Sequence, residues 1–291
     1  MQNIPFTFCC EMPHDLRCWP LMLDSLAAGG VENLVFGNGI FSAIADAPDK
    51  HLQVAKLMAD AGMKFVDGHA QFAPGSTLVA PDEFRPMVVA NHKLQLETMA
   101  TFGVKSCCFH IGKSNSYPGL TVEKAADNVR KTLELTLKEA EKLNIVICLE
   151  NIFHPLNTTS FLLELMRDFA SPCLGVCFDC GHANIMEKHM PQSVMYSSWA
   201  ACGKNADEIE WDENSLEKLI PHIIMCHLHD NNGVTDQHLL PGEGTVDFDA
   251  VFAGLEKAPR LLSYQSETLP LKNQITGRKL GKTWLEFLKK Y

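Results

Sequence analysis

The feature that most constrains the fold is a regular alternation of short apolar runs with longer segments of helical periodicity. The apolar runs are five to seven residues long and rich in Val, Ile, Phe and Cys, and several show no polar alternation. Strands that are buried on both faces of a parallel sheet have this composition. The pattern predicts eight strands: Ile4–Cys10, Asn33–Gly37, Lys64–His69, Ser106–Ile111, Ile145–Glu150, Gly175–Asp179, Met225–His229 and Leu261–Glu267.

The segments between these runs predict helices. The clearest helix follows Thr121, a good N-cap residue, carries one apolar stripe and ends at Asn144. Gly62 and Gly103 stand where two other helices should end. The polar segment from Met186 to Asp212 is expected to be an extended loop with short helices. Further helices are predicted over Pro48–Ala61, Asp82–Phe102, Ser160–Phe169, Phe248–Lys257 and Gly277–Lys290.

Eight strands that alternate with helices predict an α/β protein, a single (β/α)8 TIM barrel domain over residues 1–291. The length of 291 residues suits one such barrel, which needs about 250. The alternative is an open doubly wound sheet, which would usually carry a glycine-rich phosphate loop after its first strand. That position reads CCEMPHD, so the barrel is favoured.

The composition excludes several classes of protein. Hydrophobic residues make up 46% of the chain, enough for a large core, yet no apolar run approaches the roughly 20 residues of a membrane helix. The net charge of −10 disfavours nucleic acid as a partner. Most of the 11 cysteines lie in apolar runs, which is typical of buried free thiols in a reducing compartment, and the first residues resemble no secretory leader. We therefore expect a cytoplasmic protein.

Ionisable residues cluster at the C-terminal ends of the predicted strands, which all point to one mouth of a barrel. The histidines at or just beyond strand ends are His69, His110, His182, His227, His229 and His238. The acids in the same positions are Glu150, Asp179, Glu267 and Asp236. Carboxylates at the ends of apolar strands lose hydration and need a cation, yet no arginine stands at these strand ends.

A divalent metal ion would supply that cation, and mixed carboxylate and imidazole ligation suits Mn, Zn, Co or Fe better than Ca. The set expected to bind it is Glu150, Asp179, His227 and Glu267. Side chains two apart on a strand face the same way, so the choice between His227 and His229 stays open. The other histidines that can be assigned, His14, His51, His92, His189 and His222, are expected to be solvated. The triplet GEG at residues 242–244 is expected to form a tight turn.

Four segments carry a resemblance to a known superfamily. They are LEN at Leu149–Asn151, FDCGHA at Phe178–Ala183, HLHDNNGVTDQHLLPGEGTVDF at His227–Phe248, and SET at Ser266–Thr268. Together they resemble the xylose isomerase-like TIM barrels, which include sugar-phosphate isomerases and epimerases, ketose 3-epimerases and zinc apurinic-site endonucleases. The long third segment is the most specific of the four.

The resemblance implies roles for these residues. Glu150, Asp179, a histidine of the His227/His229 pair and Glu267 match the shared metal ligands, and the two glutamates match the acid/base pair of the epimerases. His182 matches a histidine that contacts substrate. The endonucleases bind two additional zinc ions. His69 and His110 match ligands of one of these ions, and His182, Asp236 and His238 match the ligands of the other.

The chain departs from both branches. Ketose 3-epimerases carry an arginine in the loop that here reads NNGVTDQH, and this loop has none. The DNA-penetrating loops and basic residues of the endonucleases have no clear equivalent, and the net charge is −10. The metal core therefore resembles both branches, whereas the surroundings resemble the sugar enzymes more.

The leading hypothesis is a metal-dependent sugar or sugar-phosphate isomerase or epimerase that works through a metal-stabilised enediolate. Glu150 would remove a proton and Glu267 would return one, while His182, His154 and Trp199 would contact the substrate. This hypothesis implies a small carbohydrate substrate and at least one Mn, Zn, Co or Mg ion per chain. A homo-oligomer is compatible with it. The alternatives are a multi-zinc apurinic-site endonuclease-like phosphodiesterase with about three ions, a keto-glycoside lyase or hydrolase, and a non-catalytic sugar sensor.

Overall fold

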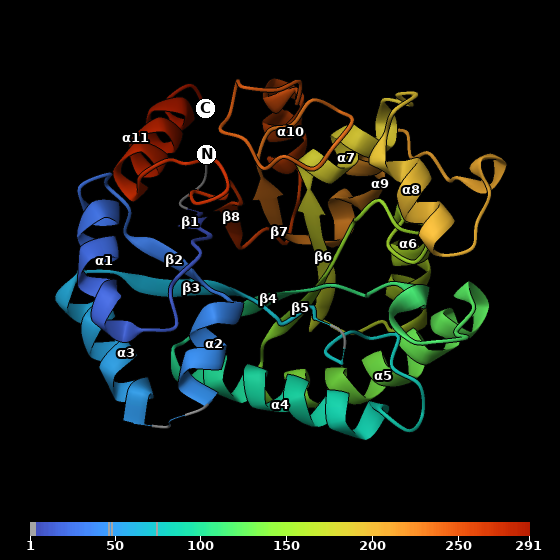
Figure 1. The fold of residues 1–291 in the computed structure, drawn as a ribbon, viewed down its shortest axis with the longest axis horizontal. Helices are drawn as coiled ribbons and strands as arrows, with labels where there is room; N and C mark the ends of the chain where they lie inside the picture. The colour runs from blue at the N-terminus through green and yellow to red at the C-terminus, as the bar shows by residue number, and fades with distance from the viewer. Residues whose placement is uncertain (1–3, 46, 48, 74) are drawn as a thin grey trace.

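The computed structural model describes residues 4–291 except 46, 48 and 74, and in this part of the chain the strands form a closed parallel barrel (Figure 1). Each strand pairs with the next, and β1 pairs with β8 to close the ring, with Phe8 opposite Ser266. The strands are β1 Phe6–Phe8, β2 Asn33–Phe36, β3 Lys64–His69, β4 Ser106–Phe109, β5 Val146–Glu150, β6 Leu174–Asp179, β7 Ile223–Leu228 and β8 Ser263–Ser266. The predicted (β/α)8 fold is confirmed, and the limits of β3 match the prediction.

Helices form the outer layer of the barrel, with α4 and α5 along one side in Figure 1 and α10 and α11 on the opposite side. The α-helices are α1 Trp19–Ala27, α2 Asn38–Ala45, α3 Asp49–Asp60, α4 Arg85–Thr101, α5 Val122–Leu143, α6 Thr159–Asp168, α7 Cys180–Glu187, α8 Val194–Ala201, α9 Ser215–Leu219, α10 Phe248–Leu255 and α11 Gly277–Leu288. Short 3-10 helices are η1 Leu16–Cys18, η2 Ser114–Ser116, η3 Ala206–Glu208 and η4 Ile220–His222. Among the described residues, none of these helices is long and apolar enough to cross a membrane.

The caps and periods that predict helices are present in the structure. The Thr121 side chain accepts a hydrogen bond from the Lys124 N–H at the start of α5, and Asn144 ends the helix with a φ of 53°. Gly62 and Gly103 also have positive φ after α3 and α4. Pro48, the predicted first residue of the third helix, lies outside the described residues. The sequence does not single out helices α1, α2 and α7, because their apolar residues show no long amphipathic stripe.

His92 corrects one prediction. The sequence predicts a solvated side chain, but this one is fully buried between α4 and α5. Its Nε2 lies 2.8 Å from the Ser76 carbonyl oxygen and its Nδ1 lies 3.2 Å from the Thr136 hydroxyl. Burial, partly opposed by the Ser76 contact, lowers the pKa of His92 to about 4, so the imidazole is neutral in the folded protein at neutral pH.

Candidate metal-binding active site

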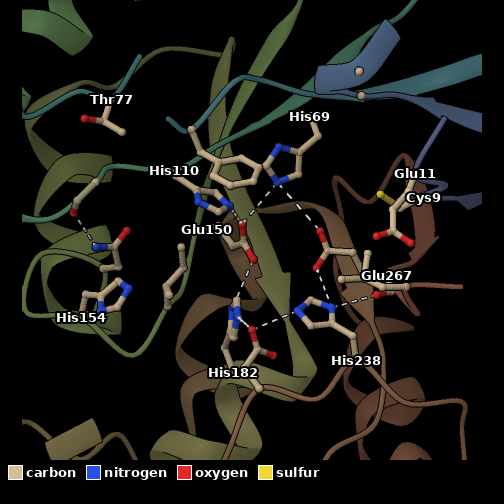
Figure 2. Close-up of a pocket in the computed structure, with 18 of the residues that line it drawn as sticks. Cys9, Glu11, His69, Thr77, His110, Glu150, His154, His182, His238 and Glu267 are labelled. Atoms are coloured by element: carbon tan, nitrogen blue, oxygen red, sulfur yellow. Dashed lines mark hydrogen bonds and ion pairs between the residues drawn. The ribbon is translucent and has the colours of Figure 1, made fainter. Parts of the chain in front are cut away.

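A cavity of about 800 Å³ opens at the C-terminal ends of the strands (Figure 2). This is the end of a (β/α)8 barrel at which active sites lie, and the volume is typical of ligand pockets, which span roughly 300–1,000 Å³. The polar residues that the sequence places at strand ends line it, with His69 at the end of β3, His110 after β4, Glu150 at the end of β5 and Glu267 after β8. The convergence expected from strand direction is therefore present.

The centre of the site is formed by Glu150, Asp179, His227 and Glu267. One nitrogen or oxygen atom of each lies within 4.8 Å of the others. His227 Nδ1 lies 3.2 Å from Glu150 Oε1, 3.4 Å from Glu267 Oε2 and 3.7 Å from Asp179 Oδ2. The four residues are between 0% and 8% exposed. This central cluster is the set that the sequence singles out as metal ligands.

The two histidines at the end of β7, His227 and His229, have different neighbours. Both point into the barrel, as their spacing requires. His227 faces Glu150 and Glu267, whereas His229 Nε2 lies 3.1 Å from both carboxylate oxygens of Asp179. The geometry therefore groups His227, rather than His229, with the central cluster.

Two flanking clusters adjoin the central one. The first contains His69, Cys108, His110 and Glu150, with His110 Nε2 at 2.8 Å from Glu150 Oε2 and the Cys108 thiol at 3.2 Å from the same oxygen. The second contains His182, His229, Asp236 and His238. Its His238 Nε2 lies 2.9 Å from Asp236 Oδ2, and its His182 Nε2 lies 3.5 Å from that oxygen. Each cluster offers enough nitrogen, oxygen or sulfur donors for an ion.

Backbone carbonyls orient three of these imidazoles. His69 Nδ1 lies 2.9 Å from the Ala70 carbonyl oxygen, His182 Nδ1 lies 2.9 Å from that of Asn151, and His238 Nδ1 lies 2.8 Å from that of Glu267. Because each carbonyl can only accept, Nδ1 carries a proton in all three, which leaves Nε2 as the nitrogen that can bind a metal once it is free of its own proton. A hydrogen bond from the outer nitrogen to a carbonyl is the usual support of a metal-ligating histidine.

The electrostatics show how strongly the buried acids require positive charge. Burial raises the pKa of Glu150, but His227 and His110 outweigh it and hold the pKa well below its usual range. Burial lowers the pKa of His227, but Cys177, Glu267 and Glu150 together raise it well above its usual range. Among the described residues, no lysine or arginine forms an ion pair with any of these acids. The cluster thus takes up positive charge, either as protons on imidazoles or as a metal cation.

The donor set fits a divalent ion. Three buried carboxylates and one imidazole converge, which is the mixed oxygen and nitrogen set that zinc and similar metals accept. In the second flanking cluster, Asp236 Oδ1 is buried without a hydrogen-bond partner, although it faces His229 Nε2 at 3.9 Å. A buried carboxylate oxygen without a partner is costly, and a cation would remove that cost.

Neighbouring residues explain why the acids and histidines lie where they do. The Asn151 side chain bridges β5 and β6, because it donates to the Asp179 carbonyl oxygen at 2.9 Å and accepts from the Asp179 N–H at 2.8 Å. Asp179 itself caps α7 by accepting from the His182 N–H at 2.6 Å. A Cβ atom on Gly181 would overlap the His229 ring, so this position requires glycine.

Asp230 fixes the loop that carries Asp236 and His238. Its buried carboxylate accepts hydrogen bonds from the backbone N–H groups of Asn231, Gly242, Gly244 and Val246, at 2.9 to 3.0 Å. The GEG triplet is therefore a tight turn, as predicted, and the structure adds that it surrounds a carboxylate. Sequence reasoning assigns no role to Asp230, Asn151 and Cys108, although the first two lie inside the segments that carry the family resemblance and Cys108 alternates with His110 along one strand face.

Of the two further residues expected to contact substrate, one lines the cavity. His154 does so, and its Nδ1 is hydrogen-bonded to the Ser198 hydroxyl. Trp199 does not lie in the cavity wall of the described structure. It is buried in an apolar cluster with Ile152 and Phe153, which do line the cavity, because α8 packs behind this wall instead of covering the mouth.

Comparison with known proteins identifies the family. The family model described as xylose isomerase-like TIM barrel matches residues 24–265. The chain belongs to this family. A curated relative is the uncharacterised protein MJ1311 of Methanocaldococcus jannaschii, 30% identical over 171 residues, or 57% of this chain and 52% of the relative. The chain thus spans about half the length of that relative.

Several solved structures share the fold over nearly the full chain. A D-tagatose 3-epimerase-like protein is 21% identical, with a TM-score of 0.68 and coverage of 99% of both chains. An IOLI protein that was solved with a zinc atom is 18% identical, also with a TM-score of 0.68 and 99% coverage of both. At these identities the likeness shows the fold.

Proposed function

We propose that this protein is a divalent-metal-dependent isomerase or epimerase of a small sugar or sugar phosphate. The observation that carries the proposal is the placement of two buried glutamates on opposite sides of one space. Figure 2 shows the Glu150 and Glu267 carboxylates facing this space, with His69 on one side and His182 and His238 on the other. The epimerase-like relative and the zinc-bound relative support the sugar substrate and the metal, respectively.

In this proposal the ion would be held by Glu150, Asp179, His227 and Glu267. As a Lewis acid it would lower the pKa of the C–H group next to the substrate carbonyl. One glutamate removes the proton from that carbon, and the other returns a proton to the opposite face, which inverts the carbon. Return of the proton by the first glutamate to the neighbouring carbonyl carbon, with the hydroxyl proton passing to the carbonyl oxygen, instead isomerises the sugar. The Nε2 atom of His182 is available to a sugar hydroxyl, because its Nδ1 is held by the Asn151 carbonyl oxygen.

Exchange of substrate protons with solvent tests the proposal. The metal-loaded protein is incubated in D2O with a panel of ketopentoses, ketohexoses and their phosphates, and deuterium at the carbons next to the carbonyl is measured. Glu150→Gln and Glu267→Gln should each abolish exchange, because neither amide can take up the proton. Glu256→Gln, a change at an exposed residue after α10, is the matched control and should exchange normally. Normal exchange in both active-site variants would contradict the proposal.

A multi-metal phosphodiesterase is the second candidate, favoured by the two flanking clusters. Together with the central cluster they form three adjoining groups of metal-binding donors beside Glu150 and Asp179. Enolisation of a sugar needs only one metal site. This candidate predicts about three ions per purified chain and nicking of duplex DNA at abasic sites. A count near one ion, with intact abasic duplex, would exclude it and favour the sugar enzyme.

A further inference from the structure

One end of the cavity differs in chemistry from the end that holds the acids and histidines. We call it the Lys113 end and define it by Thr77, Gly112, Lys113, His154 and Asn157, which all line the cavity. Figure 2 shows Thr77 and His154 on the opposite side of the cavity from Glu11, His238 and Glu267. This end is not part of the three donor clusters.

Close packing and hydrogen bonds hold the Lys113 end in place. Gly112 has a φ of 101°, and a Cβ atom there would lie 2.6 Å from Thr77 Cβ, so the loop before Lys113 packs directly against Thr77. Asn157 Nδ2 donates to the Gly112 carbonyl oxygen at 3.1 Å, and the Asn157 N–H donates to the His154 carbonyl oxygen at 2.9 Å. The residues therefore form one preorganised wall.

Two polar atoms in this wall are buried and have no hydrogen-bond partner. They are Thr77 Oγ1 and Asn157 Oδ1, on residues that are 3% and 0% exposed. Because the Asn157 amide nitrogen already donates to Gly112, its oxygen is left as an acceptor, while the Thr77 hydroxyl can donate. Buried polar groups in folded proteins are nearly always paired, so both atoms indicate a polar ligand.

The charge at this end comes from one residue. Lys113 is the only lysine or arginine among the described residues that line the cavity, and it forms no ion pair with any described carboxylate. Burial, together with the nearby charge of Lys113, lowers the pKa of His154 to about 2, so that imidazole is neutral. The acids that line the cavity, Glu11, Glu150, Asp236 and Glu267, belong to the other parts of its wall. The cavity thus has an acidic end suited to a metal and a cationic end.

We propose that Lys113, aided by the Thr77 hydroxyl, binds an anionic group of the substrate, either a phosphate or a carboxylate. This inference rests on the proposed sugar isomerase function and deepens it, because it narrows the substrate to a sugar phosphate or a sugar acid. The carbonyl end of the sugar lies at the central cluster, and Asn157 Oδ1 accepts a hydrogen bond from a sugar hydroxyl. An ammonium group is a common binding partner of phosphate and carboxylate groups.

Binding measurements with three probes test the inference. The dissociation constants of an uncharged ketopentose, a ketopentose 5-phosphate and a ketohexuronate are measured by calorimetry on the metal-loaded protein. Lys113→Met should weaken binding of at least one charged probe by roughly 10- to 100-fold, the range for loss of one charge-assisted contact, and leave the uncharged probe unaffected. Lys113→Arg should keep most of the affinity. Lys105→Met is the matched control, an exposed lysine at the opposite end of β4 that forms no ion pair with any described residue.

The outcomes separate this inference from the proposed function. The charged probe that depends on Lys113 shows whether the group is a phosphate or a carboxylate. Equal binding of all three probes by the unmodified protein would overturn the inference, as would charged probes that bind Lys113→Met as tightly as the unmodified protein. Binding of a charged probe that depends on Lys113, without any deuterium exchange into sugars, would support the anion site and contradict the isomerase proposal.

Discussion

The substitution Asp230→Asn tests how the loop that carries Asp236 and His238 is held. The carboxylate of Asp230 accepts four backbone hydrogen bonds, two on each oxygen. Asparagine keeps one acceptor oxygen and turns the other into a donor that faces two N–H groups. At least two bonds are lost. With a charged acceptor each contributes about 1.5–3 kcal/mol, and the lower value applies because Gly242 is exposed to solvent. The loop should therefore be less stable by about 3 kcal/mol.

Hydrogen exchange read by mass spectrometry measures this loss. Because 1.4 kcal/mol is a tenfold change, protection of the amides in residues 231–246 should fall by about 100-fold. Asp247→Asn is the control, because Asp247 caps α10 with one hydrogen bond to Ala250 and asparagine caps equally well. Unchanged protection in Asp230→Asn would refute the view that this carboxylate holds the loop.

Three further predictions concern stability. Because the pKa of His92 is lowered to about 4 in the folded protein from 6.5, its contribution to stability is complete above pH 6.5 and is lost as the pH falls to 4. The difference in unfolding free energy between the unmodified protein and His92→Gln should therefore shrink by about 3 kcal/mol over that window, and a constant difference would contradict it. Gly181→Ala should lower the unfolding free energy in urea by roughly 1–3 kcal/mol and reduce metal content, because its Cβ overlaps His229. If Ala instead stabilises α7 by about 1 kcal/mol, as helix propensity alone predicts, the result contradicts an overlap between a Cβ atom at position 181 and the His229 ring. Adding Mn, Zn or Co at 100 times its dissociation constant should raise the unfolding free energy by about 2.7 kcal/mol, an effect that a chelator reverses and that a Glu150→Gln/Asp179→Asn protein lacks.

Strand direction and hydrophobic period are sufficient to predict much of the site from the amino-acid order alone. Apolar runs end in acids and histidines, and parallel strands bring such ends together, which places the central cluster and the flanking histidines at one mouth of the barrel. The limits of β3 and the end of α5 at Asn144 follow from local chemistry in the same way.

Features that depend on packing between distant segments cannot be predicted in this way. His92 lies on a helix whose sequence does not reveal that α5 covers it, so its burial is not foreseen. Trp199 packs behind the cavity wall rather than in it, because the path of the long segment after α7 decides which side of the wall it packs against. Lys113 and Asn157 line the same end of the cavity because Asn157 donates to the carbonyl oxygen of Gly112, a residue that also packs on Thr77, and these are contacts between distant loops.

The most direct test of the central claim is anomalous diffraction from crystals grown with Mn, Zn or Co, recorded at the absorption edge of the metal. A divalent ion bound by Glu150, Asp179, His227 and Glu267 predicts a strong peak about 2.0–2.2 Å from one atom of each side chain. Crystals of the folded protein that show no anomalous peak beside these four residues at a saturating metal concentration would contradict the claim.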